Sequence, residues 1–224
     1  MKSFIALFAL LALFTLISAA QAEMPPPIRT ISGNVVVSPR DPAAHIEVPA
    51  AATYVGAVRF ALFGTADCEI HLFVEADPSK RVQRVYWVQF EAYLPERPDL
   101  RYDLSPAYSP LEMSGLPFYQ RARFGLSSEV PRVGSDTQRA YSLLAENGYS
   151  LPPETTSVTY KHFFADMRKE LLLIVIEDMS LSGITFAQLV QNGKVQATWP
   201  PIAEQIMARA STAFSVRLTS QAKK

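Results

Sequence analysis

Apolar and polar residues alternate with a period of two from Tyr54 to Leu94, the pattern of strands that bury one face. The stretch falls into three parts because Gly64–Asp67 and Asp77–Lys80 hold small or turn-forming residues. Links this short join antiparallel neighbours, so a three-stranded meander is predicted. Its apolar rows are Val58, Phe60 and Leu62; then Cys68, Ile70, Leu72 and Val74; then Tyr86, Val88, Phe90 and Ala92.

Further strands and three helices are predicted after the meander. Alternation returns over 118–126 and 158–164, and 171–176 is a continuous apolar run, typical of a central strand covered on both faces. Two helix starts are indicated by capping-box spacing, Ser135 with Gln138 and Thr185 with Gln188, the second helix ending at Gly193; an amphipathic helix begins near Trp199. These elements predict an α+β fold: a mostly antiparallel, meander-like sheet of about six strands with two or three helices packed on one face.

The first residues have the pattern of a signal peptide. Lys2 is followed by an apolar stretch from Phe4 to Ile17 and by Ala20-Gln21-Ala22, a small-x-small cleavage site. That apolar stretch is too short for a comfortable membrane span. We therefore predict a signal peptide over 1–22, cleaved after Ala22, and a soluble protein in a periplasm or secreted, with no stable membrane span after cleavage. A retained N-terminal anchor is the alternative.

The mature chain is predicted to form one domain. A Pro/Ala-rich segment over 23–53 contains a short strand at 31–37, and 38–52 is interpreted as a surface connection or edge segment. Residues 54–220 form the single α+β domain, and 221–224 form a polar tail. The loop at 95–117 carries five prolines, and two interpretations stay open for it: a plain crossover, or a lid or partner-binding surface.

Charge and cysteine content narrow the function classes. Lys and Arg number 21, as do Asp and Glu, so loss of Lys2 leaves one acid in excess. Because nucleic-acid and anionic-membrane binders need a basic excess, neither class is predicted. Cys68 is the only cysteine, which excludes a disulfide within the chain. A small buried apolar residue is favoured there over a reactive or intermolecularly paired thiol.

Catalytic and cofactor motifs are sparse. The sequence has no Gly-rich phosphate loop, no dinucleotide fingerprint and no Gly-x-Ser-x-Gly elbow. Three histidines are too few for a His-rich metal site, and Cys68 and His71 point to opposite faces of a strand, so neither a metal nor a cofactor is predicted. Glu69 and His71 share a face; an ordinary solvated strand pair is favoured there over an acid/base pair.

Six residues are candidate ligand contacts: Trp87, Tyr86, Phe90, His162, Arg121 and Arg123. The three aromatic residues belong to the densest aromatic group of the chain, which forms either core or the lining of an apolar cavity. The histidine lies in an apolar strand row and is either a satisfied core residue or a ligand contact. The two arginines form either a solvated strand face or a receptor for an anionic ligand.

Because no catalytic motif is present, the favoured hypothesis is a non-catalytic exported protein. It would bind an apolar or amphiphilic small molecule or an envelope protein through the sheet and its covering helix. Two alternatives remain. One is a periplasmic hydrolase or isomerase that uses His71 or His162 with a carboxylate. The other is an envelope assembly factor that acts through the 95–117 loop.

Overall fold

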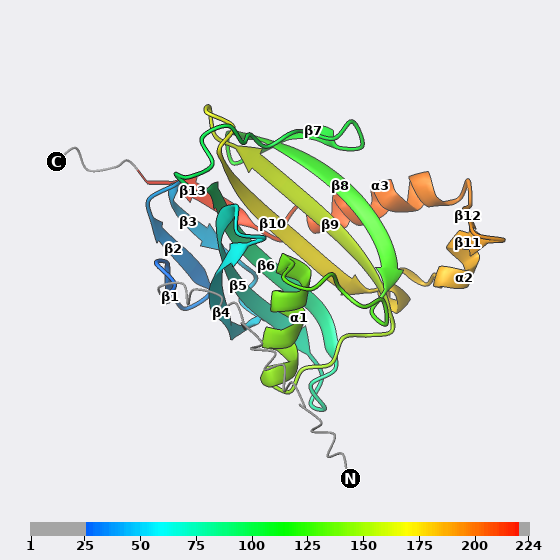
Figure 1. Cartoon of the computed structure of the whole chain (residues 1–224). Helices are drawn as coiled ribbons and strands as arrows, with labels where there is room; N and C mark the ends of the chain where they lie inside the picture. The colour runs from blue at the N-terminus through cyan, green and yellow to red at the C-terminus, as the bar shows by residue number, and fades with distance from the viewer. Residues whose placement is uncertain (1–25, 220–224) are drawn as a thin grey trace, which may run out of the picture.

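The structure, a computed structural model, describes residues 26–219 (Figure 1). The predicted signal peptide over 1–22 and the polar tail over 221–224 therefore lie outside the described residues. None of the helices between Pro26 and Thr219 has the length and apolar character needed to cross a bilayer.

A seven-stranded antiparallel sheet forms the centre of the molecule, in the order β4-β5-β6-β10-β9-β8-β7. It consists of two meanders joined where β6 pairs with β10, with Val88 opposite Leu173. The predicted antiparallel, meander-like sheet is thus confirmed, with seven strands in place of about six. Its strands are β4 (Thr53–Leu62), β5 (Ala66–Ala76), β6 (Val82–Tyr93), β7 (Ser109–Met113), β8 (Leu116–Leu126), β9 (Glu154–Phe163) and β10 (Lys169–Asp178).

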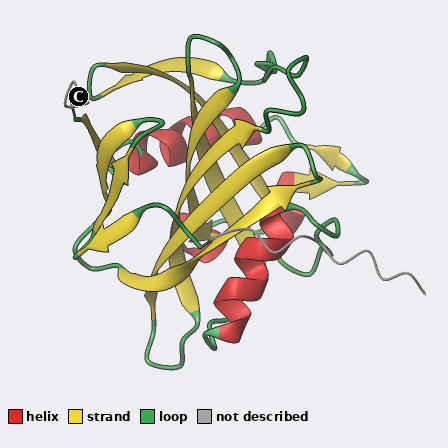
Figure 2. Cartoon of the chain, turned by 60° about the vertical axis from the view of Figure 1, so that its left-hand side comes forward, coloured by secondary structure: helices red, strands yellow, loops and turns green. Residues whose placement is uncertain are grey.

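Both faces of this sheet are covered. The inner face carries Tyr86, Val88 and Phe90 of β6 and packs in one core with helix α3 (Trp199–Ala210). The outer face carries Trp87 of β6 and packs in a second core with helix α1 (Asp136–Glu146). Figure 2 shows the helices on opposite sides of the sheet.

The prediction of helices packed on one face is therefore wrong. The central strands β5, β6 and β10 are apolar on both sides, so each face requires its own cover. The predicted caps are confirmed: the Ser135 side chain accepts from the backbone N–H of Gln138, and Thr185 forms a full capping box with Gln188.

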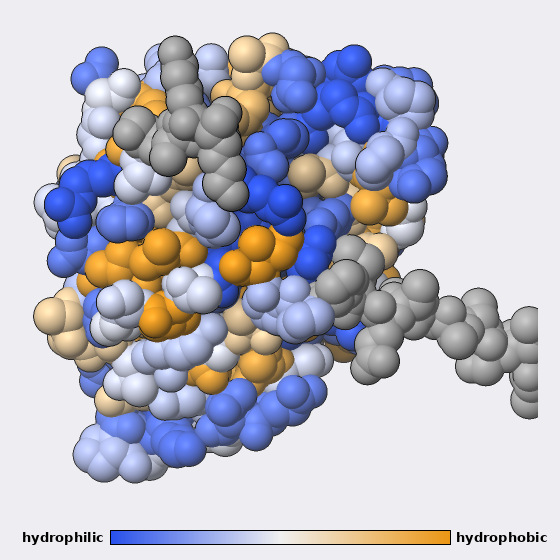
Figure 3. Space-filling model, turned by 90° about the vertical axis from the view of Figure 1, so that its left-hand side faces the viewer, coloured by the Kyte–Doolittle hydropathy of each residue, from blue (hydrophilic) through white to orange (hydrophobic). Residues whose placement is uncertain are grey.

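A second, four-stranded sheet in the order β1-β2-β3-β13 packs against the inner core. Its strands are β1 (Thr30–Ser32), β2 (Val35–Pro39), β3 (Ala43–Glu47) and β13 (Ser215–Leu218). The interpretation of 38–52 as a surface connection or edge segment is wrong, because β3 lies there between β2 and β13, with Ala44 and Ile46 fully buried. Apolar groups on this side of the molecule are separated by polar ones (Figure 3).

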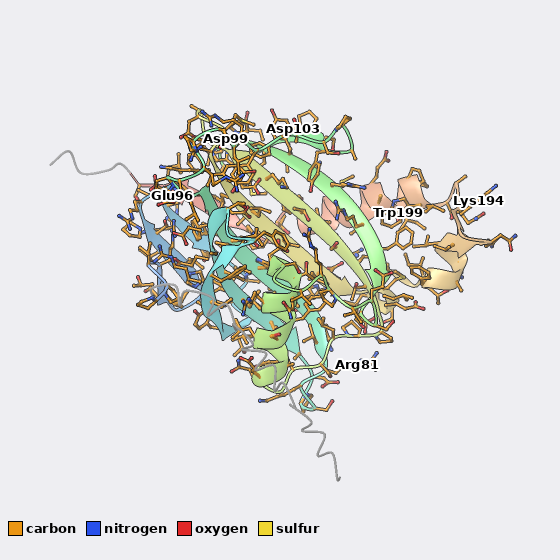
Figure 4. The ribbon with its side chains drawn as sticks, in the orientation of Figure 1. Arg81, Glu96, Asp99, Asp103, Lys194 and Trp199 are labelled. Carbon is orange, nitrogen blue, oxygen red and sulfur yellow. The ribbon has the colours of Figure 1, made fainter. Side chains whose placement is uncertain are left out.

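The loop predicted at 95–117 contains a strand, β7, after a crossover that spans 94–108. The crossover leads from β6 in the middle of the sheet to β7 at its edge, passing β10, β9 and β8. The guanidinium of Arg168 fixes it by donating to the carbonyls of Leu94, Arg97 and Leu100, at 3.1, 2.7 and 3.2 Å. Figure 4 shows Glu96, Asp99 and Asp103 along this segment at one end of the molecule.

A small hairpin projects between β10 and α3. The 3-10 turn η1 (Met179–Ser182) and the one-turn helix α2 (Phe186–Leu189) precede β11 (Val190–Gln191) and β12 (Lys194–Val195). The predicted end of the second helix at Gly193 is too late, because the positive φ of Asn192 and Gly193 forms the hairpin turn. Trp199 at the start of α3 lies against Phe124 of β8, with ring centroids 4.6 Å apart (Figure 4).

Candidate functional site

A groove of about 610 Å³ lies on the outer face of the large sheet. Helix α1 packs mainly over β4 and β5, at one side of the outer face. The bridging segment, residues 127–134, leads from the end of β8 to the start of α1 and has to cross β9, β10 and β6 on the way. The groove is bounded by the outer face, the bridging segment and the first turn of α1.

Strand register sets up a gradient of polarity across the outer face, and six residues of two paired rows line the groove: Trp87, Ile174, Ile176, Ser157, Thr159 and Arg123. One row of directly paired residues runs Trp87, Ile174, Thr159 and Arg121, from β6 through β10 and β9 to β8. The next row runs Val85, Ile176, Ser157 and Arg123. In both rows the side chains change from apolar to hydroxyl to guanidinium. The floor is therefore apolar near α1 and cationic at β8.

Buried polar groups continue the outer face beyond the apolar end of the groove. The indole N–H of Trp87 donates to Gln89 Oε1 at 2.9 Å, and Gln89 Nε2 donates to Glu91 Oε2 at 2.8 Å. The hydroxyl of Tyr102, from the crossover, donates to the other oxygen of Glu91 at 2.9 Å. Burial raises the pKa of Glu91, although its two donors oppose the shift. This chain fixes the orientation of the Trp87 ring on the groove floor.

Glu170 lies directly opposite Glu91 in the β6–β10 pair. Burial and, to a smaller degree, the nearby Glu91 carboxylate raise the pKa of Glu170 to about 7, although Lys161 acts in the opposite direction. The ammonium of Lys161 donates to Glu170 at 3.1 Å and also lines the groove. One charged group of the groove is thus tied to a buried carboxylate that titrates near neutrality.

The two arginines of β8 have no carboxylate partner among residues 26–219. Arg121 lies 6.0 Å from the ring centroid of Tyr108, a groove-lining residue, and Lys161 lies 5.9 Å from the same ring. Arg123 is exposed and makes neither a hydrogen bond nor an ion pair with any residue between 26 and 219. Its five donors are accessible to an anion in the groove.

The structure divides the six predicted ligand contacts between the two faces. Trp87 and Arg123 line the groove, and Arg121 lies in the same row as Trp87. The other three are in or beside the inner core. Tyr86 donates its hydroxyl to Glu75 Oε1 at 2.6 Å, Phe90 lies 4.0 Å below the guanidinium of Arg29, and His162 donates Nδ1–H to the carbonyl of Pro117 at 2.8 Å.

Several groove residues were missed by the sequence analysis: Ser157, Thr159, Lys161, Leu172, Ile174 and Ile176. The three on β9 alternate with the apolar row of Val158 and Tyr160, so their polar face was visible in the sequence. What the sequence did not show is that this face lies between the apolar face of β10 and the arginines of β8.

Glu69 and His71 form a buried pair on the inner face, so their interpretation as a solvated pair is wrong. Each side chain is 1 % exposed, and Glu69 Oε1 lies 2.9 Å from His71 Nε2. The ring Nδ1 of His71 lies 3.3 Å from the Tyr54 hydroxyl, and Nε2–H donates to Glu69.

The N-terminal segment supplies the cover over this pair. The backbone N–H groups of Ile28 and Arg29 each donate to Glu69 at 2.9 Å, and the Arg29 guanidinium donates at 3.1 Å. Burial raises the pKa of Glu69, but the bonds from His71, Ile28 and Arg29 outweigh it and lower the pKa to about 2. The pair thus holds the start of the described chain against β5.

Cys68 is fully buried on the outer face, as predicted, and burial raises its pKa. Within the described chain, His, Cys, Asp and Glu side chains form no group of three or more that could hold a metal ion. No family model matches the sequence, and neither a curated protein nor a solved structure matches it.

Proposed function

We propose that the protein is an exported binding protein that holds a small amphiphilic molecule in the groove on the outer face. The observation that carries this proposal is the side-chain gradient across β6, β10, β9 and β8, from Trp87 and Ile176 through Ser157 to Arg123, all of which line the groove. Ligand sites combine a largely apolar lining with a few well-placed polar groups, and this floor has both. A volume of about 610 Å³ is within the range of small-molecule sites.

Export is part of the proposal because of the signal-peptide pattern over 1–22. A catalytic role for the histidines has less support. Glu69 and His71 are 1 % exposed on the face opposite the groove, and the ring Nδ1 of His162 is occupied by a backbone carbonyl. A partner-binding role for the 95–117 loop has less support as well, since Arg168 ties its first half to the sheet.

The test is native mass spectrometry of the protein isolated from the periplasm of an exporting host, compared with its denatured mass. We expect extra mass that is released on denaturation. Ser157→Phe places a ring in the middle of the groove floor and should remove this extra mass. Ser215→Phe, the same change at an exposed strand position of the small sheet, should keep it. A bare mass for the unmodified protein, or retention of the ligand by Ser157→Phe, would contradict the proposal.

A further inference from the structure

We infer that the groove selects amphiphiles whose head group is an oxyanion, a carboxylate or a phosphate, bound by Arg123 and Lys161, which line the groove, and by Arg121 beside them. The apolar part of the ligand lies over Ile174 and Ile176 and points toward Trp87. This inference rests on the proposed function and names the ligand class for the same site.

Charge complementarity at the β8 end supports an anionic head group. Arg123 and Lys161 line the groove there from two neighbouring strands, and Arg121 shares a face of β8 with Arg123 and lies near the Tyr108 ring, as Lys161 does. Of these, Lys161 alone has a carboxylate partner within the described chain, Glu170 at 3.1 Å, and its ammonium has a third proton left to donate. Guanidinium groups bind carboxylate and phosphate through two parallel hydrogen bonds, which suits the accessible Arg123.

The opposite end of the groove disfavours an anion and so fixes the orientation of the ligand. Asp136, in the first turn of α1, lines the groove there, and Glu91 lies buried beyond Gln89. Like charges repel, so an anionic head placed at this end is unfavourable. The bridging segment carries one charge of each sign at the groove, Glu129 and Arg132, and adds no net preference.

The hydroxyl groups between the two ends fit the same orientation. Thr159 and Ser157 lie between the isoleucines of β10 and the arginines of β8, where the polar and apolar parts of an amphiphile meet. From β6 to β8 there are three strand intervals, which at about 4.8 Å each give a span of ~14 Å. A single acyl chain of medium length with a head group at one end matches this span.

The experiment uses the fluorescence of Trp87 in the full mature protein. Trp199→Phe removes the only other tryptophan and keeps a ring against Phe124. The probes are decanoate, decyl phosphate and decan-1-ol, which share one alkyl chain and differ in the head group. We expect both anions to bind at least tenfold more tightly than the alcohol, and the tighter anion identifies the head-group chemistry.

Substitutions at the arginines separate the head-group inference from groove binding itself. Arg121→Gln/Arg123→Gln should bring decanoate affinity down to that of decan-1-ol and leave the alcohol unchanged. Arg123→Lys keeps the charge but loses the two parallel donors of the guanidinium. Its affinity for decanoate should lie between those of the unmodified protein and the double variant. Arg217→Gln, at an exposed position of β13, should change neither affinity.

The outcomes distinguish the two proposals. Equal affinity for decanoate and decan-1-ol, unaffected by the arginine substitutions, would overturn the oxyanion inference and leave groove binding in place. Failure of all three probes to bind would overturn the proposed function itself. Binding that survives Ser157→Phe would also overturn it, because the ligand would then lie elsewhere.

Discussion

At the scale of single residues, Glu170 is the side chain whose charge conflicts most with its surroundings. It is buried, it faces the Glu91 carboxylate on the neighbouring strand, and its one cationic partner among residues 26–219 is Lys161. Its pKa near 7 lies well above the usual value for a glutamate in an unfolded chain, about 4.3. The folded protein therefore holds a proton on Glu170 over a pH range in which the unfolded chain has lost it.

This proton makes the contribution of Glu170 to stability depend on pH. Because the folded-state pKa is raised, the contribution is most favourable below about pH 4.3, declines as pH rises to about 7, and is constant above that value. Glu170→Gln removes the titration. At each pH, the free energy of unfolding of the variant is compared with that of the unmodified protein. This difference should shift in favour of the variant by about 2 kcal/mol between pH 5 and pH 8. Urea unfolding at the two pH values measures this difference.

Glu112→Gln, at an exposed position of β7, serves as the matched control, because its stability difference from the unmodified protein should be nearly the same at both pH values. A pH-independent difference for Glu170→Gln as well would show that Lys161 keeps Glu170 ionised throughout.

At the scale of elements, a second buried glutamate ties α3 to the sheet. Glu177 of β10 accepts from Arg84 Nε at 2.9 Å and from Arg209 Nη2 of α3 at 2.6 Å. Burial raises the pKa of Glu177, but these two guanidiniums outweigh burial and lower it. Its stabilising effect is thus present above the unfolded-state pKa and is lost as pH falls through the folded-state value.

Substitution of Glu177 should lower the free energy of unfolding more than substitution of Arg209. Glu177 is 5 % exposed, and Glu177→Gln leaves two guanidiniums without their shared carboxylate, so we expect a loss of about 3 kcal/mol in the free energy of unfolding. Arg209 is 40 % exposed and Arg84 would still pair with Glu177, so Arg209→Gln should lose about 1 kcal/mol or less. Chemical unfolding at pH 7, with hydrogen exchange on α3, measures both.

If neither variant lost stability, α3 would be held by its apolar face alone. Packing of Ile206 and Ala210 in the inner core would then account for the whole attachment.

Elements differ in how far their sequence predicts them. Alternation and capping signals located the strands around Trp87 and the helix after Ser135, because both are local properties of the chain. The strand at Ala43–Glu47 escaped prediction, because alanine and the flanking prolines are poor β-formers and its pairing with β13 joins residues far apart. The face covered by each helix escaped prediction for the same reason: it depends on tertiary packing.

The groove shows the same division between local and non-local information. The sequence identified Trp87, Arg121 and Arg123 one by one, and aromatic density added Tyr86 and Phe90, which alternate with Trp87 and therefore face the other core. Only the register of β6, β10, β9 and β8 brings tryptophan, isoleucine, hydroxyl and arginine into one row. Glu69 and His71 were misinterpreted for the same reason. Alternation placed both side chains on one face, but the sequence did not show that the N-terminal segment covers that face.

At the scale of the whole molecule, the inner face of the large sheet packs against both ends of the described chain, whereas the outer face carries the groove. The inner face binds both ends of the described chain, since β1, β2 and β3 from one end and β13 from the other form one small sheet over it. The Glu69–Arg29 contact adds a further attachment for the first residues. The outer face carries the groove, and the groove residues are absent from the inner core.

Glu69→Gln tests this separation. The loss of a carboxylate that accepts from Ile28, Arg29 and His71 should lower the free energy of unfolding by about 3 kcal/mol at pH 7. This deficit should shrink as pH falls from about 4 toward 2, because the unmodified protein then protonates Glu69 and loses the same contacts. Hydrogen exchange should locate the change in residues 28–38, the segment that the carboxylate holds.

Decanoate binding, followed by Trp87 fluorescence, should meanwhile stay within about twofold of the unmodified protein, because the sheet separates Glu69 from the groove. Thr53→Ser, at an exposed position of the edge strand β4, provides a control that should alter neither property. If Glu69→Gln weakened decanoate binding tenfold while the protein stayed folded, the N-terminal attachment would be coupled to the groove through β5 and β6. The two faces would then act as one unit, with the start of the chain controlling access to the ligand site.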